Sequence, residues 1–460
     1  MHPALSMLQL RPLHNASPPH GLTGDRDKTV VNIRIWRAIV ASCAAVALTA
    51  CGGGGGGNSS DNTNVRVVNA TVTHASIDVL ANSATAISAT PRDSASGYAV
   101  VASGGPALQI NDSASGSALA TLTPSVSKDA HYVVIAYESG GVVRTTVIAE
   151  DTGAPVAGTA SLRVFDAATD AGAIDIFVTD PAVDITTLTS PTFSFSASTT
   201  LQASGFLSIA PGTYRVRVTG GGNPSDVRLD MPAVTFTNQQ VAALFLSPTV
   251  GGTLVNGAAL AQQGAYTAGR NTSARVRIAA AVTNAAKVSA SAASAVIAAN
   301  VVAPSVGGYV LVPAGTAINV SVNGNSVAVA GAAPAAGSDS TLLVYGNAAA
   351  STASLIADDN HLPTTSGSLK LRLIDAVTGA ASPLTLDAAF GVIASNVAPG
   401  TASPYAVVAS STALRIDVFS PASLTPVYSD SALSLPGNAV YTLFMLGDAA
   451  APIPLLRKDR

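Results

Sequence analysis

The chain has 460 residues, of which 48% are hydrophobic and only 11% are charged. From residue 51 onward it carries 18 Lys and Arg against 24 Asp and Glu. This sparse, mildly acidic balance argues against nucleic acid as a partner, because such binding normally requires a basic patch. Cys43 and Cys51 are the two cysteines. Because Cys43 falls in an expected signal segment, no intrachain disulfide is expected, and stability must come from packed apolar cores.

Residues 34–51 have the pattern of a bacterial lipoprotein signal. A basic region precedes the apolar stretch 38–50, whose 13 residues suit a signal-peptide core and are too few to span a bilayer, which takes about 20 residues. Leu48-Thr49-Ala50-Cys51 then resembles a lipobox, which is cut before an acylated cysteine. We therefore expect Cys51 to be lipidated; an ordinary cleaved signal or an unprocessed N-terminus is the alternative.

The extension before this segment is long for a signal peptide. The 33 residues ahead of the basic region already equal a whole signal peptide, which usually totals about 15–30 residues. We expect translation to begin near Val30 rather than at Met1. Residues 1–50 are assigned to the signal peptide with this extension, and 51–64 to a lipidated, glycine-rich tether. Gly52 after the cysteine is typical of outer-membrane sorting.

Downstream, one unit recurs four times. It opens with a short alternating strand in which an arginine stands between apolar residues, and the four arginines are 97, 114 and 95 residues apart. A second strand follows about 12 residues later, clearest as Ile77-Asp78-Val79 and Ile174-Asp175-Ile176. The opening strands span 65–70, 162–167, 276–281 and 371–376.

Each copy continues with three further strands, of which the first follows an aromatic residue and the last is fully apolar. Period-2 alternation, β-branched residues and turn residues every 8 to 12 positions indicate antiparallel β-sheet. The Ala-rich stretch 279–302 is also compatible with a helix, but its valines favour strands. The introducing aromatics are Tyr98, Phe206, Tyr309 and Tyr405.

The predicted fold is all-β, with four tandem immunoglobulin-like antiparallel β-sandwich modules arranged as two duplicated pairs. About seven strands in ~95 residues suit such a module, whereas a propeller blade uses four strands in ~40–50 residues. Copies one and three share a tag, Ile148-Ala149-Glu150-Asp151 and Ile356-Ala357-Asp358-Asp359, which indicates the pairing. The predicted modules span 65–158, 159–258, 273–366 and 367–460, with a linker over 259–272.

These motifs resemble a bacterial envelope family known as domain of unknown function 4397. The resemblance lies in the opening strand, the Ile-Asp-Val strand and an aromatic before a turn such as Pro211-Gly212 or Pro313-Ala314-Gly315. It extends over most of residues 65–460, but copies three and four depart from it at the Ile-Asp-Val strand. The family's His-Ala-Ser-Pro-Asp-Ala-Pro motif survives only as the displaced Thr73-His74-Ala75-Ser76. The resemblance implies an extracytoplasmic lipoprotein of β-sandwich modules, with no catalytic residues to carry over.

The repeated arginines are the first candidates for function. Because their strand neighbours are expected to point inward, each arginine should point to solvent or to a seam between modules. There it would contact an anion or glycan, or else pair across strands with Asp78 or Asp175, a contact worth ~0.2–1 kcal/mol. We favour the structural pairing. The four arginines are Arg66, Arg163, Arg277 and Arg372.

No metal, cofactor or catalytic site is expected. The acidic pairs at 150–151 and 358–359 stand at module ends, but calcium needs 6–8 oxygen ligands, and we interpret the pairs as solvated linker charge. His74, His131 and His361 show no zinc-ligand spacing. No nucleophile elbow or phosphate-binding loop occurs.

These observations favour a non-enzymatic, membrane-anchored lipoprotein of the cell envelope that acts as a binding or structural module. Its expected partners are the lipid bilayer, through acylated Cys51, and an envelope protein or glycan. One alternative is a carbohydrate- or surface-binding adhesin, which predicts an exposed aromatic cluster. The other is an envelope hydrolase, which predicts a concave pocket with perturbed carboxylates. The expected location is the outer membrane, facing the periplasm or the cell surface.

Overall fold

The computed structural model describes residues 61–379, 383–421 and 423–460. These residues form strands joined by turns, with one short 3-10 helix, η1 (Ile185–Thr187). None of the described helical structure has the length and apolarity needed to cross a bilayer. Ser60–Arg460 is one compact unit. Cys51, the signal segment and most of the tether lie outside the described residues, so those predictions stay predictions.

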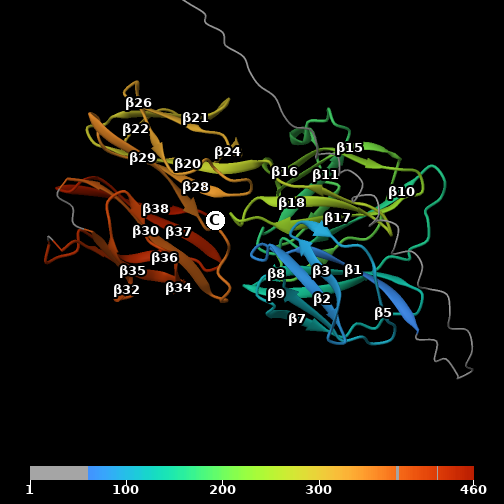
Figure 1. The fold of residues 1–460 in the computed structure, drawn as a ribbon. Helices are drawn as coiled ribbons and strands as arrows, with labels where there is room; N and C mark the ends of the chain where they lie inside the picture. The colour runs from blue at the N-terminus through green and yellow to red at the C-terminus, as the bar shows by residue number, and fades with distance from the viewer. Residues whose placement is uncertain (1–60, 380–382, 422) are drawn as a thin grey trace, which may run out of the picture. The chain divides into compact units, whose positions relative to one another are not determined.

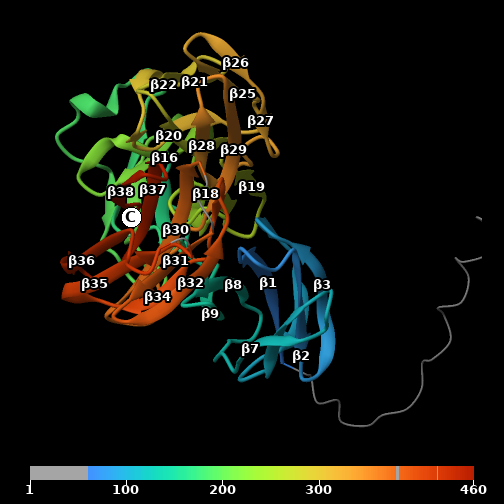
Figure 2. The same ribbon diagram turned by 90° about the vertical axis from the view of Figure 1, so that its left-hand side faces the viewer.

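The described strands form eight sheets, arranged as four sheet pairs that follow one another along the chain (Figure 1). In each sheet pair an inner sheet of five or six strands faces an outer sheet of four strands, and buried residues from both form one apolar core. Figure 2 shows the first sheet pair, in blue, from a second direction. The all-β prediction is therefore confirmed.

The first sheet pair has the inner order β4-β1-β8-β9, with β5 also beside β1, and the outer order β3-β2-β6-β7. Its strands are β1 (Asn62–Ala70), β2 (Ser76–Ala81), β3 (Ala84–Pro91), β4 (Ser94–Ala95), β5 (Ala99–Ala102), β6 (Leu108–Asp112), β7 (Ala118–Leu122), β8 (His131–Ser139) and β9 (Val142–Ala149).

The second sheet pair has the inner order β13-β10-β17-β18-β19, with β14 beside β10, and the outer order β12-β11-β15-β16. Its strands are β10 (Ala160–Asp166), β11 (Ile174–Thr179), β12 (Phe193–Phe195), β13 (Gln202–Ala203), β14 (Leu207–Ile209), β15 (Gly212–Gly220), β16 (Asn223–Phe236), β17 (Val241–Pro248), β18 (Val255–Ala261) and β19 (Tyr266–Gly269). The predicted linker 259–272 thus contains the end of β18 and all of β19.

The third sheet pair has the inner order β23-β20-β28-β29-β27, with β24 beside β20, and the outer order β22-β21-β25-β26. Its strands are β20 (Ser273–Val282), β21 (Lys287–Ala292), β22 (Ala295–Val302), β23 (Ser305–Val306), β24 (Val310–Pro313), β25 (Ile318–Val322), β26 (Asn325–Val327), β27 (Val329–Ala330), β28 (Asp339–Asn347) and β29 (Ala350–Asp358). The stretch 279–302 is therefore built of strands, as predicted.

The fourth sheet pair has the inner order β33-β30-β37-β38, with β34 beside β30, and the outer order β32-β31-β35-β36. Its strands are β30 (Ser368–Thr378), β31 (Leu384–Ala388), β32 (Gly391–Val397), β33 (Thr401–Ala402), β34 (Ala406–Ala409), β35 (Ser411–Phe419), β36 (Tyr428–Leu435), β37 (Ala439–Asp448) and β38 (Ala451–Lys458).

One pairing in every sheet pair corrects the antiparallel prediction. The strand with the repeated arginine lies parallel to the long apolar strand: β1 to β8, β10 to β17, β20 to β28 and β30 to β37. The chain between these two strands passes through the outer sheet, and such a crossover lets the apolar strand return in the direction of the first. A further antiparallel strand follows it, so the apolar strand is not the last of its copy.

The parallel strands are mostly apolar because both of their faces are buried. One face lies in the core of its own sheet pair, and the other packs against the inner sheet of a neighbour. In the first seam, between the first and second sheet pairs, Phe165 and Phe245 stack with ring centroids 5.1 Å apart. In the second seam, between the third and fourth, Leu343 packs with Ile374 and Phe444.

Candidate functional site

Three of the four repeated arginines are buried in these seams. Arg66 lies in the first seam and Arg277 and Arg372 in the second, and their side chains expose at most 4% of their surface. Val65 and Val67 point into the core, so strand alternation directs the arginine between them to the opposite face. The predicted seam position is confirmed for these three, whereas Arg163 is only partly buried.

In the first seam the ion pair of Arg66 stays within the first sheet pair. Its Nε donates to Glu150 Oε2 at 2.7 Å, and a second nitrogen donates to the other carboxylate oxygen. The Tyr98 hydroxyl donates to the same carboxylate at 2.5 Å. Across the seam the guanidinium donates to the carbonyls of Gly264, at 2.7 Å, and Ala261, at 3.0 Å. Only hydrogen bonds to carbonyls therefore connect this guanidinium to the second sheet pair.

In the second seam the two arginines exchange partners across the seam. Arg277, from the third sheet pair, donates to Asp459 after β38 of the fourth, and Arg372, from the fourth, donates to Asp358 at the end of β29 of the third. A threonine hydroxyl also donates a hydrogen bond to each carboxylate: Thr341 to Asp358 at 2.7 Å, and Thr442 to Asp459 at 2.5 Å. Each buried acid is thus paired with an arginine of the neighbouring sheet pair.

Two sequence-based interpretations of these charges were wrong. Asp78 and Asp175 do not bind the repeated arginines; Asp78 accepts the backbone N–H of Ala89 and the hydroxyl of Ser113, both at 2.7 Å. Glu150 and Asp358 are not solvated linker charges, since each residue is only 4% exposed. Spacing along the chain could not show this, because the acids reach the arginines across the inner sheet.

The second copy lacks this ion pair. Gln262 occupies the position that Glu150 has in the first copy, and Phe206 replaces the tyrosine. Arg163 instead lies over the rings of Phe165, at 4.5 Å, and Phe206, at 4.8 Å. Burial without a paired carboxylate lowers the pKa of Arg163, although the charge of Glu150 opposes this. A signal was present in the sequence: an acid ends the last strand in the other three copies.

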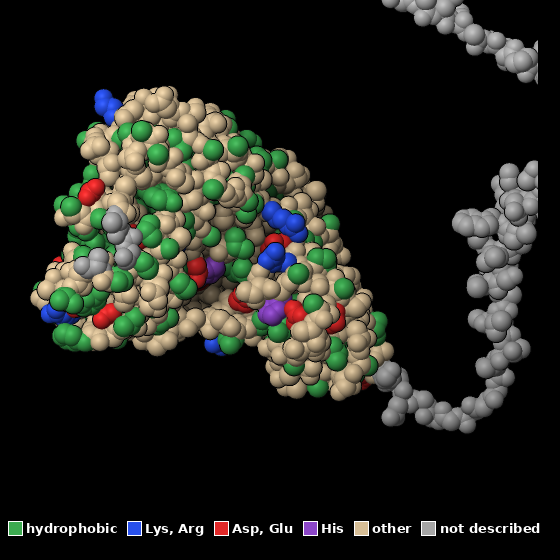
Figure 3. Space-filling view, turned by 60° about the vertical axis from the view of Figure 1, so that its left-hand side comes forward, with side chains coloured by type: hydrophobic (Ala, Val, Ile, Leu, Met, Phe, Trp, Pro, Cys, Tyr) green, Lys and Arg blue, Asp and Glu red, His purple; other side chains and the backbone are tan. Residues whose placement is uncertain are grey.

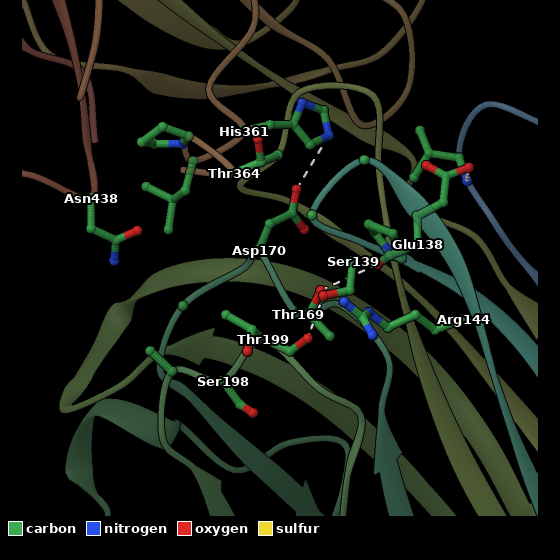
Figure 4. Close-up of a pocket in the computed structure, with 18 of the residues that line it drawn as sticks. Glu138, Ser139, Arg144, Thr169, Asp170, Ser198, Thr199, His361, Thr364 and Asn438 are labelled. Carbon is green, nitrogen blue, oxygen red and sulfur yellow. Dashed lines mark hydrogen bonds and ion pairs between the residues drawn. The ribbon is translucent and has the colours of Figure 1, made fainter. Parts of the chain in front are cut away.

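A cavity of about 830 Å³ lies where loops of all four sheet pairs meet. Its walls come from the loop after β1, the β8–β9 hairpin, the loops after β10 and β12, the segment after β29 and the turn before β37. Figure 3 shows a hollowed face with acidic and histidine side chains. Figure 4 shows Asp170 pointing toward His361, and Arg144 on the side of Glu138. Sequence reasoning did not find this site, because it is assembled from loops of four copies.

The ring of His361 is held at the edge of the cavity through both of its nitrogens. Its Nδ1 lies 2.7 Å from Asp359 Oδ1, and its Nε2 lies 3.1 Å from the carbonyl of Thr249 and 3.4 Å from Asp170 Oδ2. Burial disfavours the charged ring, but the hydrogen bond to Asp359 and the charges of Asp170 and Asp359 outweigh it and raise the pKa of His361. Both ring nitrogens are engaged by acceptors, so neither faces a hydroxyl as a general base would.

A close backbone approach fixes this arrangement. Gly252, at φ +83°, lies against the segment after β29, where an added Cβ would come within 2.5 Å of the amide nitrogen of His361. Only glycine tolerates both that φ and that contact. The Arg460 side chain also reaches here and donates to the carbonyls of Gly252 and Asn360.

The acidic groups of the cavity are satisfied by the protein itself. Glu138 accepts the backbone N–H of Val72, at 3.1 Å, and both the N–H and the hydroxyl of Thr73, at 2.9 and 2.7 Å. Asp359 is paired with Lys370 at 2.5 Å, besides His361. Burial raises the pKa of Asp170, which the charge of His361 partly offsets.

Four polar side chains of the cavity, one of them cationic, are free. Among the described residues, four lining side chains are exposed and have no hydrogen-bond or ion-pair partner in the chain. They are Arg144, Thr199, Thr364 and Asn438. The groups that remain available to bind a ligand in the cavity are therefore a guanidinium, two hydroxyls and an amide.

The three candidate histidines do not come together. His74 lies 2.9 Å from Asp112 and His131 lies 3.1 Å from Asp151, apart from His361. Within residues 61–379, 383–421 and 423–460, no group of three metal-ligating side chains occurs. The aromatic cluster predicted for an adhesin is not found there either: of the described Phe and Tyr residues only Phe206 and Phe390 are exposed, and they belong to different sheet pairs.

Comparison with known proteins gives one family match. Residues 63–177 match the family model described as "Domain of unknown function (DUF4397)", so the resemblance inferred from the motifs is confirmed over the first sheet pair and into β11. The match covers 115 of the 460 residues. No curated protein matches the chain.

One solved structure to which the chain is similar is described as a "putative cell adhesion protein" from Bacteroides ovatus. The identity is 10%, and the alignment covers 66% of this chain and 97% of that one, with a TM-score of 0.13. A likeness at that TM-score carries no argument about fold or function.

Proposed function

We propose that this chain is a non-enzymatic binding protein of the bacterial envelope, anchored through acylated Cys51 and holding its ligand in the cavity at the junction of the four sheet pairs. One observation carries the proposal: the cavity exposes a guanidinium, hydroxyls and an amide that the chain leaves without partners. Its volume of about 830 Å³ falls in the range of about 300–1,000 Å³ that small-molecule sites occupy.

A binding role is favoured over the hydrolase alternative by the geometry of the cavity. Hydrolysis needs a base within reach of a nucleophile or water. The ring of His361 is engaged by Asp359, Asp170 and a carbonyl. The Ser139 hydroxyl donates to the Thr199 carbonyl instead. The pKa of Asp170 is raised by burial, and its carboxylate faces His361 rather than a nucleophile.

Blocking the cavity tests the binding role. Ala197 is exposed and lines the cavity, so Ala197→Trp is expected to fill it and to abolish binding on an array of bacterial and host glycans. Ala182, also exposed and in the same sheet pair, lines no part of the cavity, and Ala182→Trp should bind as the unaltered chain does. Array binding that is absent throughout, or equal in both variants, would contradict the proposal.

Anchoring is tested separately at Cys51. A diacylated cysteine makes membrane attachment stable, since each buried methylene contributes about 0.8 kcal/mol. We expect the chain to fractionate with membranes and Cys51→Ser to release it, with mass spectrometry of the N-terminal peptide showing the acyl mass only in the former. Cys43→Ser is the matched control and should leave the chain on the membrane. An unmodified Cys51 peptide would refute the anchor.

A further inference from the structure

A second hollow adjoins the cavity and carries two more arginines. This hollow, about 370 Å³ in volume, shares the wall residues Val72 and Pro248 with the first, and we call the two together the groove. Arg92 and Arg270 line the second hollow, and Arg144 lines the first. Each hollow therefore presents at least one arginine, in a chain that is mildly acidic from residue 51 onward.

The charges of these arginines are largely available to a ligand. Arg144 has no carboxylate within 4.0 Å in the described chain, and Arg92 donates to the carbonyl of Val72 rather than to an acid. Arg270 has its nearest carboxylate, that of Asp93, at 3.8 Å, and its side chain is 61% exposed. Burial raises the pKa of Asp93, and Ser247 and Asn256 also bond to it.

Besides Arg144, the first hollow offers groups that suit sugar hydroxyls. Thr199, Thr364 and Asn438 have free side-chain donors and acceptors. No Phe, Tyr or Trp lines either hollow, so there is no platform for stacking bases. An acidic peptide would instead seek unpaired backbone groups at a strand edge, and the walls here are loops and hairpin ends.

From the two adjoining hollows, the arginines that line both and the free hydroxyls and amide of the first, we propose that the groove binds a linear oligosaccharide that carries carboxylate or sulfate groups. Arg92, Arg144 and Arg270 would bind the acidic groups through charge-assisted hydrogen bonds. Thr199, Thr364 and Asn438 would bind the sugar hydroxyls. The proposal rests on the proposed function and adds the class of ligand.

The test is calorimetry with defined probes on the intact chain. The probes are an oligogalacturonate for carboxylate, a heparin-derived oligosaccharide for sulfate, and the carboxyl-reduced oligogalacturonate as a neutral analogue. We expect binding of at least one acidic probe, weakened by salt, and at least tenfold weaker binding of the neutral analogue. Which acidic probe binds more tightly distinguishes the two sources of charge.

Variants locate the contact. Arg144→Ala, Arg92→Ala and Arg270→Ala are each expected to weaken acidic-probe binding about tenfold or more, since one charge-assisted hydrogen bond carries that much affinity. Arg457 is exposed and lines neither hollow, so Arg457→Ala is the matched control and should leave binding unchanged. Because all four arginines are at least partly exposed, their loss should not unfold the chain, which circular dichroism checks.

The contradicting outcomes are distinct from those of the proposed function. Equal binding of the neutral analogue, or equal losses in Arg457→Ala, would overturn the acidic ligand while leaving a binding role intact. Tighter binding of polyglutamate or of single-stranded DNA than of the acidic glycans would overturn the sugar. Binding that survives Ala197→Trp would place the ligand elsewhere and remove both proposals.

Discussion

Replacing Arg372 with alanine is expected to lower the free energy of unfolding by roughly 3–5 kcal/mol, which is the usual loss when one partner of a buried ion pair is removed. Asp358 would stay in the second seam without the guanidinium that now faces it. The variant would also leave the carbonyl of Ala357 and the hydroxyl of Thr442 without donors now at 3.1 Å. Urea unfolding of the intact chain, followed by circular dichroism, measures the loss.

Arg163→Ala is the matched control, because it removes the same residue type from the same place in the second copy. Arg163 has no carboxylate partner and contacts only aromatic rings, so a loss of about 1 kcal/mol or less is expected. Similar losses for the two variants would mean that the exchanged ion pairs do not distinguish the second seam from the first. An intermediate loss for Arg372→Lys would separate charge from the geometry of the guanidinium.

Stability is expected to fall as the pH rises from about 4 to about 7, because two buried aspartates hold protons in the folded chain. Burial raises the pKa of Asp166 to about 7, against a hydrogen bond from the Ala168 N–H that lowers it. Burial likewise raises the pKa of Asp375 to about 6. At a pH between the unfolded pKa of 3.8 and the folded pKa, each carboxyl is protonated only in the folded state. In that range each carboxyl therefore lowers the free energy of unfolding by about 1.4 kcal/mol for every unit that the pH rises.

Asp166→Asn and Asp375→Asn test this expectation, since asparagine keeps the shape without the proton. Each variant should have the same free energy of unfolding as the unaltered chain at pH 4 and a higher one at pH 8, by about 4 kcal/mol for Asp166. The first copy already has asparagine there: Asn69 accepts the Thr71 N–H and donates to the Thr90 carbonyl, both at 3.1 Å. Asn69→Asp is the reciprocal variant and should introduce a new decline with pH.

Replacing both Asp166 and Asp375 with asparagine should remove only part of the dependence of stability on pH. The pKa of His361 is raised above 6.5, so the stability that its charge contributes is complete below pH 6.5 and is lost as the pH rises through the folded pKa. A residual decline above pH 6.5 is therefore expected after both aspartates are replaced. A profile that Asp166→Asn and Asp375→Asn leave unchanged would contradict the assignment of the lower part to these two carboxyls.

The strand assignments could be predicted because each depends on a local period. Ile77 and Val79 alternate with polar residues toward one core, and the same rhythm recurs in every copy, so β2, β11 and their equivalents follow from the sequence. The parallel pairing of β1 with β8 could not be predicted in this way, because a strand buried on both faces is mostly apolar whichever direction its neighbour runs.

The carboxylate partners of the arginines could not be predicted from the sequence for another reason. Local rules pair Arg66 with an acid on an adjacent strand of a hairpin, whereas Glu150 lies 84 positions away. Arg277 reaches Asp459 across 182 positions, between two sheet pairs. The cavity is harder still, since Glu138, Asp170, His361 and Asn438 come from four copies and none belongs to the repeated motif.

The exchange of arginines makes the second seam resemble a two-fold homodimer interface contained in a single chain. Pulling the third sheet pair away from the fourth would break the buried ion pairs of Arg277 with Asp459 and of Arg372 with Asp358, which is costly in a dry interior. Arg277 would keep only Asp358 of its own sheet pair, 3.7 Å away. Separating the first sheet pair from the second would keep the buried Arg66–Glu150 pair whole. It would break the hydrogen bonds of Arg66 to carbonyls and the partly exposed Arg270–Asp93 contact at 3.8 Å. Under load, for example when an anchored chain is pulled by a bound surface, the chain should therefore part at the first seam, nearest the tether, while the distal half stays closed.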